Sequence, residues 1–231
     1  METNKNLWQR FMDGLELIVS SYKSRRGDPD AWEKTIQKFE NKDRLHPPEK
    51  DAILFIGSSS FTFWSTLEQD MAPLPVINRG FGGSHMRDMV RYLDRIVLPY
   101  KPRAVVLFAG TNDIVEENPD LVDLVYKGYQ EFVRRVRRAL PEVFIFFVAI
   151  TPTPTRWRYW SIAAEANRLI QEFTHNETQL GYIDFSEQLL GPDGKPDRSL
   201  FKFDGIHPNR KCYAIWTTSI KNRLETDLSF V

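Results

Sequence analysis

The chain has a single cysteine, Cys212, so no disulfide can form within it. Long apolar runs are also missing: the longest, Val143–Ile150, is far shorter than the ~20 residues of a membrane-spanning helix. There is no charge excess, because 31 Lys and Arg balance 31 Asp and Glu, which argues against binding nucleic acid through an overall basic face. The N-terminus lacks the uninterrupted apolar core of a secretory signal peptide. We therefore expect a cytoplasmic protein with no membrane span and no nucleic-acid partner.

The composition is that of a globular protein, since 42% of the residues are hydrophobic and 27% are charged. We expect a helical extension over residues 1–50, packed on a main domain over residues 51–231. The extension should hold one helix in about the first two dozen residues and a second from Ala31 towards Phe39, and it ends at Pro47-Pro48. The first helix is indicated by apolar residues at helical spacing: Trp8, Phe11, Met12, Leu15, Ile18 and Val19.

From Ala52 onwards, short apolar runs alternate with longer amphipathic segments. The predicted strands are Ile53–Ile56, Pro75–Asn78, Ala104–Ala109, Val143–Ile150 and Tyr182–Asp184. The predicted helices are Phe61–Gln69, His85–Ile96, Leu121–Ala139, Tyr159–Thr174 and Pro208–Leu224. Strands that are apolar on both faces and separated by helices indicate an α/β fold with a parallel sheet covered on both sides. Ligands bind beyond the carboxyl ends of the strands in such folds, so chemistry-bearing residues are sought there.

Three adjacent serines, Ser58, Ser59 and Ser60, follow the first predicted strand and Gly57. A serine at a strand-to-helix turn lies where backbone N–H groups can stabilise negative charge. The segment is not the G-x-S-x-G elbow of α/β-hydrolases, because Phe61 occupies the last glycine position. The alternative interpretation is a helix N-cap with polar neighbours.

Two further blocks follow the second and third predicted strands. In Gly80-Phe81-Gly82-Gly83, the place of the third glycine of G-x-G-x-x-G is taken by His85, which argues against a nucleotide loop. A glycine N–H facing a reaction centre fits the block better, and a tight turn is the alternative. In Gly110-Thr111-Asn112-Asp113, the Asn112 amide could hold an oxyanion, or it could close an Asx-turn.

Of the four histidines, His207 is the best candidate for a general base. Asp204 precedes it by three residues and could accept the Nδ1 proton, which leaves Nε2 to take a serine proton. His85 follows the glycine block and could line the same pocket. One Asp and one His are too few for a zinc site, so no metal is expected.

With these four blocks in order, the chain resembles the SGNH hydrolases of the GDSL esterase–lipase superfamily over about residues 52–216, in a subgroup that reads G-S-S-S. The resemblance implies a flavodoxin-like three-layer α/β/α sandwich with a five-stranded parallel sheet, and ester hydrolysis through an acyl-enzyme without a cofactor. By position, Ser59 corresponds to the nucleophile and Asp204 and His207 to the rest of the triad. The N–H of Ser59, Gly83 and Asn112 correspond to the oxyanion hole. Ser58 stands where the family usually has aspartate.

The substrate is less well specified by the sequence. The loop from Thr151 to Trp160 follows a strand at the same sheet edge, so Arg156 and Trp157 are candidate substrate contacts together with Ser58 and His85. The alternative for Trp157 is packing on the helix below. No long apolar lid is present, which favours short acyl or acetyl esters, for example of carbohydrate, over bulk lipid. An acyltransferase of the same fold and a non-catalytic binding protein remain alternatives, and the N-terminal helix could serve a homo-oligomer.

Overall fold

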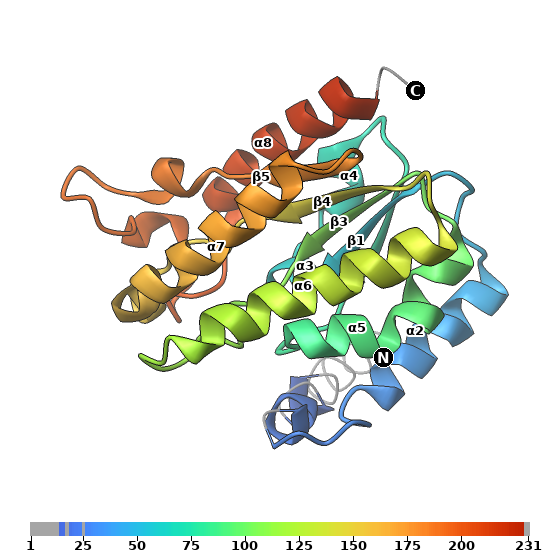
Figure 1. The fold of residues 1–231 in the computed structure, drawn as a ribbon, viewed down its shortest axis with the longest axis horizontal. Helices are drawn as coiled ribbons and strands as arrows, with labels where there is room; N and C mark the ends of the chain where they lie inside the picture. The colour runs from blue at the N-terminus through green and yellow to red at the C-terminus, as the bar shows by residue number, and fades with distance from the viewer. Residues whose placement is uncertain (1–13, 17–18, 25, 229–231) are drawn as a thin grey trace, which may run out of the picture.

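The computed structural model describes residues 14–16, 19–24 and 26–228. Its centre is a five-stranded sheet with the order β2-β1-β3-β4-β5 and every pair parallel. The strands are β1 (Ile53–Gly57), β2 (Val76–Gly80), β3 (Ala104–Phe108), β4 (Phe144–Val148) and β5 (Leu180–Ile183). Helices cover both faces of this sheet (Figure 1). The predicted three-layer α/β/α sandwich is therefore confirmed.

Alternation along the strands assigns each side chain to one of two cores. Leu54 and Ile56 belong to a cluster with residues of α2 (Glu33–Leu45), α5 (Met86–Ile96), α6 (Asp120–Ala139) and α7 (Trp160–His175). Ile53 and Phe55 belong to a second cluster, with residues of α3 (Ser59–Thr62), α4 (Leu67–Met71) and α8 (Arg210–Leu228). Successive strand residues point to opposite faces, so a strand that is apolar throughout can fill both cores.

One predicted helix is wrong in its extent. The segment Phe61–Gln69 forms two short helices, α3 and α4, in place of a continuous one. Trp64 lies between them, 1% exposed, with its indole stacked on Tyr213 of α8 at 4.9 Å between ring centroids. Its Nε1 donates to Asp70 at 2.7 Å. Burial of this large side chain, with its indole N–H hydrogen-bonded, stabilises the chain in this broken form.

The N-terminal extension contains helix, as predicted. Of the residues on which that helix was predicted, Trp8, Phe11, Met12 and Ile18 lie outside the described residues. Leu15 and Val19 are 41% and 52% exposed, whereas Ser20 and Ser24 are buried. In the described part of this helix, hydrogen bonds of Ser24 to His85 and Asp88 hold the helix on the domain.

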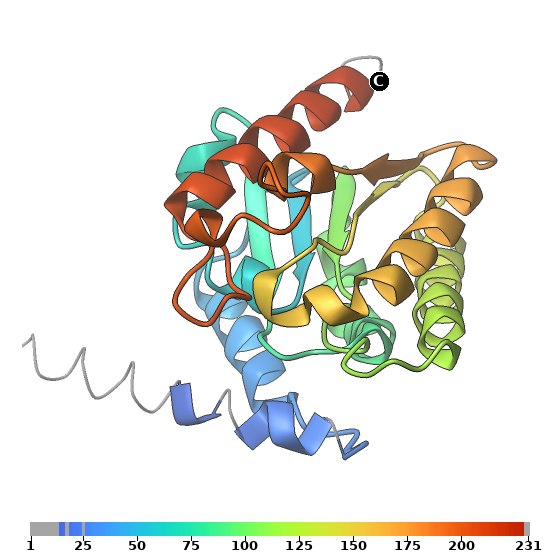
Figure 2. The same ribbon diagram turned by 90° about the vertical axis from the view of Figure 1, so that its left-hand side faces the viewer.

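The helical residues 19–24, called here the N-terminal segment, lie close to α2 and the start of α5 (Figure 2). The core nearest to them includes Trp32 and Ile36, both fully buried, in the same cluster as α5. Within the part of the chain that the structure describes, no helix is long and apolar enough to cross a bilayer.

Candidate active site

The carboxyl ends of β1, β2 and β3 bring the first three sequence blocks to one edge of the sheet. Gly57 is paired with Gly80 on one side and with Phe108 on the other. A Cβ at Gly57 would lie 2.3 Å from the Phe108 carbonyl oxygen, so only glycine allows the strands to end this close together. The turn after Gly57 is therefore fixed directly beside the ends of β2 and β3.

Backbone hydrogen bonds hold the turn that carries the serines. The Ser58 N–H donates to the Phe108 carbonyl at 3.1 Å, and the Phe61 N–H donates to the Ser58 carbonyl at 3.0 Å. Ser58 is 2% exposed and extended, and Ser59 is the first residue of α3. The turn thus forms with Ser58 at the position where the sequences that this chain resembles usually have aspartate.

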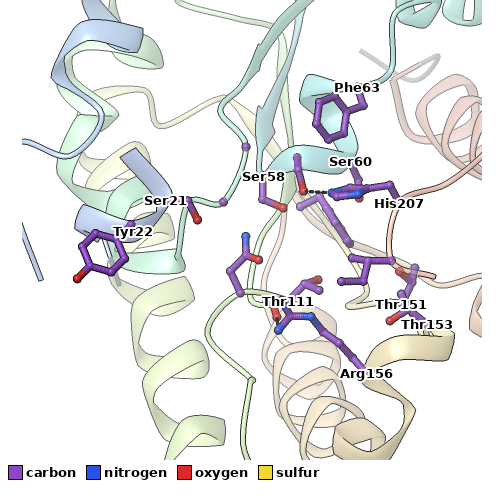
Figure 3. A pocket seen from close by; sticks show the side chains of 16 residues that line it. Ser21, Tyr22, Ser58, Ser60, Phe63, Thr111, Thr151, Thr153, Arg156 and His207 are labelled. Atoms are coloured by element: carbon purple, nitrogen blue, oxygen red, sulfur yellow. Dashed lines mark hydrogen bonds between the residues drawn. The ribbon is translucent and has the colours of Figure 1, made fainter. Parts of the chain in front are cut away.

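Of the three serines, Ser59 is the one whose hydroxyl meets the histidine. Its Oγ lies 2.8 Å from Nε2 of His207 (dashed line in Figure 3). Nδ1 of His207 lies 2.6 Å from Oδ2 of Asp204. The rings of His207 and Phe63 pack in a T-shaped arrangement, with 4.8 Å between ring centroids. This chain of contacts is the arrangement in which a histidine removes a proton from a serine.

Asp204 is held by backbone hydrogen bonds in an orientation that faces His207. Its Oδ1 accepts the backbone N–H groups of Ile206 at 2.8 Å and His207 at 2.9 Å, so Oδ2 is directed at the ring. Partial burial by itself would raise the pKa of Asp204, but the hydrogen bonds from the His207 ring and backbone and from Ile206 outweigh it and lower the pKa to about 2. Asp204 therefore remains a carboxylate throughout the neutral range.

Gly83 and Asn112 face the same space from the other side of Ser59. Gly83 has a φ of +85°, which favours glycine, and a Cβ there would lie 2.5 Å from the Ser21 Oγ. Nδ2 of Asn112 donates to the Ser84 carbonyl at 3.0 Å, which uses one of its two amide hydrogens. The second hydrogen remains for a ligand. Donors of this kind stabilise an oxyanion when they converge beside a nucleophile.

A cavity of about 300 Å³ opens above these residues (Figure 3). Arg156 of η2 (Pro154–Tyr159) is one wall, and its Nη1 donates to the carbonyl oxygens of Thr111 at 2.9 Å and Ile114 at 3.3 Å. Trp157 lies outside the lining and stacks on Trp160 at 6.0 Å. The other lining residues are Ser21, Tyr22, Ser58, Ser59, Ser60, Phe63, Gly82, Gly83, Phe108, Thr111, Asn112, Thr151, Thr153, Ile206 and His207.

A family model described as the GDSL-like Lipase/Acylhydrolase family matches residues 52–215, well over half of the chain. The chain belongs to this family. It is accordingly a serine hydrolase that acts on ester bonds. None of the curated proteins matches the sequence.

Solved structures of other proteins share the fold of this acylhydrolase. One, from Streptococcus pneumonia and described as a proposed platelet activating factor, is 21% identical, with a TM-score of 0.74 over 95% of this chain and 99% of that one. A GDSL-like lipase from Bacteroides thetaiotaomicron is 17% identical, with a TM-score of 0.69 over 83% and 98%. An acetylxylan esterase from Geobacillus stearothermophilus, solved as a catalytic mutant, is 15% identical, with a TM-score of 0.58 over 76% and 94%.

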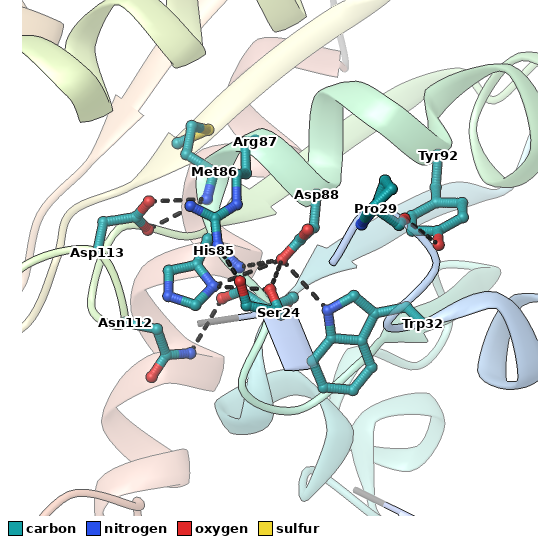
Figure 4. Close-up of polar contacts among 11 residues, drawn as sticks. Ser24, Pro29, Trp32, His85, Met86, Arg87, Asp88, Tyr92, Asn112 and Asp113 are labelled. Atoms are coloured by element: carbon teal, nitrogen blue, oxygen red, sulfur yellow. Dashed lines mark hydrogen bonds and ion pairs between the residues drawn. The ribbon is translucent and has the colours of Figure 1, made fainter. Parts of the chain in front are cut away.

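His85 does not lie on the wall of the pocket, contrary to expectation. Its imidazole is buried, and Nδ1 lies 3.1 Å from the Ser24 Oγ of the N-terminal segment (Figure 4). The His85 N–H donates to Oδ2 of Asp88 at 2.8 Å, and His85 is the N-cap of α5. A histidine near a glycine block gives no sequence signal that separates a buried capping position from a pocket position.

Asp113 was missed as a supporting residue of the site. Its carboxylate accepts the Met86 N–H, at 3.1 Å to Oδ2 and 3.3 Å to Oδ1, and so caps α5 (Figure 4). Burial raises the pKa of Asp113 to about 6. With the bond from Asn112 to Ser84, this contact ties the third sequence block to the second. The partner of Asp113 precedes it by 27 residues, so local sequence could not reveal the pairing.

Proposed function

We propose that this acylhydrolase cleaves carboxylic esters through an acyl-enzyme on Ser59. The observation that carries the proposal is the continuous chain from Ser59 Oγ to His207 Nε2 at 2.8 Å, and from His207 Nδ1 to Asp204 at 2.6 Å. Ser59 Oγ attacks the ester carbonyl carbon while His207 Nε2 takes the hydroxyl proton. The C–O bond to the alcohol then breaks, and His207 returns the proton to the leaving oxygen.

The carbonyl oxygen becomes negative in the tetrahedral intermediate. We assign its stabilisation to the backbone N–H groups of Ser59 and Gly83 and to the side-chain amide of Asn112. All three residues line the cavity. A water molecule then attacks the acyl-enzyme, with His207 again accepting and returning one proton, and the free acid leaves. Asp204, as a carboxylate, stabilises the imidazolium that forms in both halves of the reaction.

The dimensions of the site support a small acyl group. A cavity of about 300 Å³ is at the lower end of the volumes of small-molecule sites. Apolar side chains of Phe63, Phe108 and Ile206 stand beside the serine. An acetyl or short acyl ester therefore fits, and an aryl acetate is the first substrate to test. The related fold from Geobacillus stearothermophilus is itself named an acetylxylan esterase.

The test is labelling with a serine-directed fluorophosphonate, followed by peptide mapping with mass spectrometry. The probe should be found on Ser59, and Ser59→Ala should abolish both labelling and hydrolysis of the aryl acetate. Ser58→Ala is the matched control, since the hydrogen bond to His207 Nε2 is made by Ser59 and Ser58 is buried, and it should still be labelled. Labelling of another serine, or undiminished hydrolysis by purified Ser59→Ala, would overturn the mechanism. A wild type that is neither labelled nor active would indicate a binding protein.

A further inference from the structure

The N-terminal segment meets the domain directly behind the glycine turn, residues 82–85. Ser24 is fully buried, while Val19 on the same helix is 52% exposed. Burying a hydroxyl is unfavourable unless it is hydrogen-bonded, so its partners define how the segment is seated. The family match begins at residue 52, so whatever this segment contributes is supplied from outside the matched region.

Ser24 joins the two residues that shape the start of α5. Its Oγ donates to Oδ2 of Asp88 at 2.8 Å and lies 3.1 Å from Nδ1 of His85. A hydroxyl can donate one hydrogen bond, and Ser24 donates it to Asp88, so in the contact with His85 the donor must be Nδ1–H of the imidazole. The Ser24 carbonyl also accepts a hydrogen bond from Arg87. One residue of the segment thus contacts His85, Arg87 and Asp88 at the start of α5 (Figure 4).

Asp88 gathers the hydrogen bonds of the same cluster. Besides Ser24, its Oδ2 accepts the His85 N–H at 2.8 Å and the Trp32 Nε1–H at 3.2 Å. Burial alone would raise the pKa of Asp88, but the hydrogen bonds from His85 and Ser24 outweigh it and hold the pKa below its ordinary value. The carboxylate is therefore a fixed anion to which the turn, α2's leading tryptophan and the N-terminal segment are all bonded.

Ser21 brings the same helix into the pocket itself. It lines the cavity, and its Oγ lies 2.5 Å from the position that a Cβ on Gly83 would occupy. Figure 3 shows it on the opposite side of the cavity from His207. The segment consequently touches the glycine turn at two places, Gly83 from the pocket side and His85 from behind.

We propose that Ser24 is a positioning residue that fixes the glycine turn, and with it the Gly83 N–H, for stabilisation of the oxyanion. The inference rests on the proposed esterase function. Ser24 does not touch the substrate and acts through His85 and Asp88. Misplacing a preorganised donor weakens binding of the transition state more than binding of the substrate. Loss of Ser24 should therefore lower kcat and leave KM nearly unchanged.

The experiment compares Ser24→Ala with Ser20→Ala in aryl acetate hydrolysis by the full chain. Ser20 is buried on the same helix, but the bonds to His85 and Asp88 are made by Ser24. Removing an oxyanion donor outright lowers kcat by ~10²–10³, so displacing one should lower kcat roughly 10-fold. The rate of fluorophosphonate labelling should fall in parallel, and Ser24→Thr, which keeps the hydroxyl, should recover part of both. Ser20→Ala should match the wild type.

Each outcome decides the proposal. Unchanged kcat in folded Ser24→Ala, or a raised KM at constant kcat, would show a purely structural serine. If Ser24→Ala does not fold, Trp32→Phe removes another donor to Asp88 while keeping an aromatic ring. It should lower kcat at constant KM, and unchanged kcat would again overturn the inference. A wild type without hydrolysis or labelling would refute the esterase function and this inference together, whereas an active wild type with an equally active Ser24→Ala would refute the inference alone.

Discussion

Replacing Asp204 by asparagine tests the proposed catalytic chain with little change of shape. In the wild type, Oδ1 of Asp204 accepts the backbone N–H groups of Ile206 at 2.8 Å and His207 at 2.9 Å. The asparagine Oδ1 can still accept both, so the loop should keep its form. The atom facing His207 Nδ1 becomes an NH₂ donor in place of an acceptor 2.6 Å away. His207 must then carry its proton on Nε2, which faces Ser59, and it can no longer act as a base.

The expected loss is large because the tautomer is wrong in nearly every molecule. In a serine triad this substitution lowers kcat by about 10⁴, or about 5.4 kcal/mol of activation free energy. We would measure kcat for an aryl acetate, with thermal unfolding of the same preparation as the control for folding. The melting temperature should change little because the backbone bonds remain. If Asp204→Asn kept more than about a tenth of kcat, the role assigned to Asp204 would be refuted.

Three further substitutions probe the donors and their support. Asn112→Ala should lower kcat by ~10²–10³ and also destabilise the fold by about 1 kcal/mol, because the Ser84 carbonyl loses a partner; unchanged kcat with normal KM would argue against an oxyanion role. Gly83→Ala places a Cβ 2.5 Å from the Ser21 Oγ at a φ of +85°, so thermal unfolding should show a loss of at least ~1 kcal/mol together with reduced kcat. The pKa of Asp113 is raised from 3.8 to about 6, so its stabilising contribution is complete below pH 3.8 and is lost as the pH rises through about 6. The free energy of unfolding in urea should therefore rise for Asp113→Asn relative to the wild type by up to ~3 kcal/mol between acid and neutral pH. If the free energies of the two proteins changed with pH in parallel, the buried charge at Asp113 would be contradicted.

The fold and the positions of the proposed reacting groups were predictable because they follow from strand order. Apolar runs separated by helices specify a parallel sheet, and a parallel sheet collects Ser59, Gly83 and Asn112 at one edge. The spacing of Asp204 and His207 is local, so their pairing could be anticipated as well. Strand limits shifted by a few residues, as from Pro75–Asn78 to Val76–Gly80, because register with neighbouring strands sets where pairing ends.

The support behind the site could not be predicted. Ser21 and Ser24 are ordinary helix residues in the sequence, and their neighbours at 83 and 85 are about sixty positions away. Apolar periodicity instead drew attention to Leu15 and Val19, which are exposed. Trp157 was ambiguous for the same reason, because an aromatic residue next to a pocket and one stacked on Trp160 leave the same trace in sequence. Polar contacts between residues far apart in the chain leave no repeating pattern in the sequence, so they cannot be predicted from periodicity.

The contact between Ser59 and His207 joins residues 148 positions apart, and the chain between them holds strands β2, β3, β4 and β5. Because of this separation, the recovery of hydrolytic activity during refolding reports when Ser59 and His207 come together. Helices and the first strand pairs can form while the C-terminal loop is still unplaced, and spectroscopic signals would rise early. Turnover can return only after the last long-range docking step. A refolding experiment that follows both signals would thus time the closure of the active site separately from the growth of secondary structure.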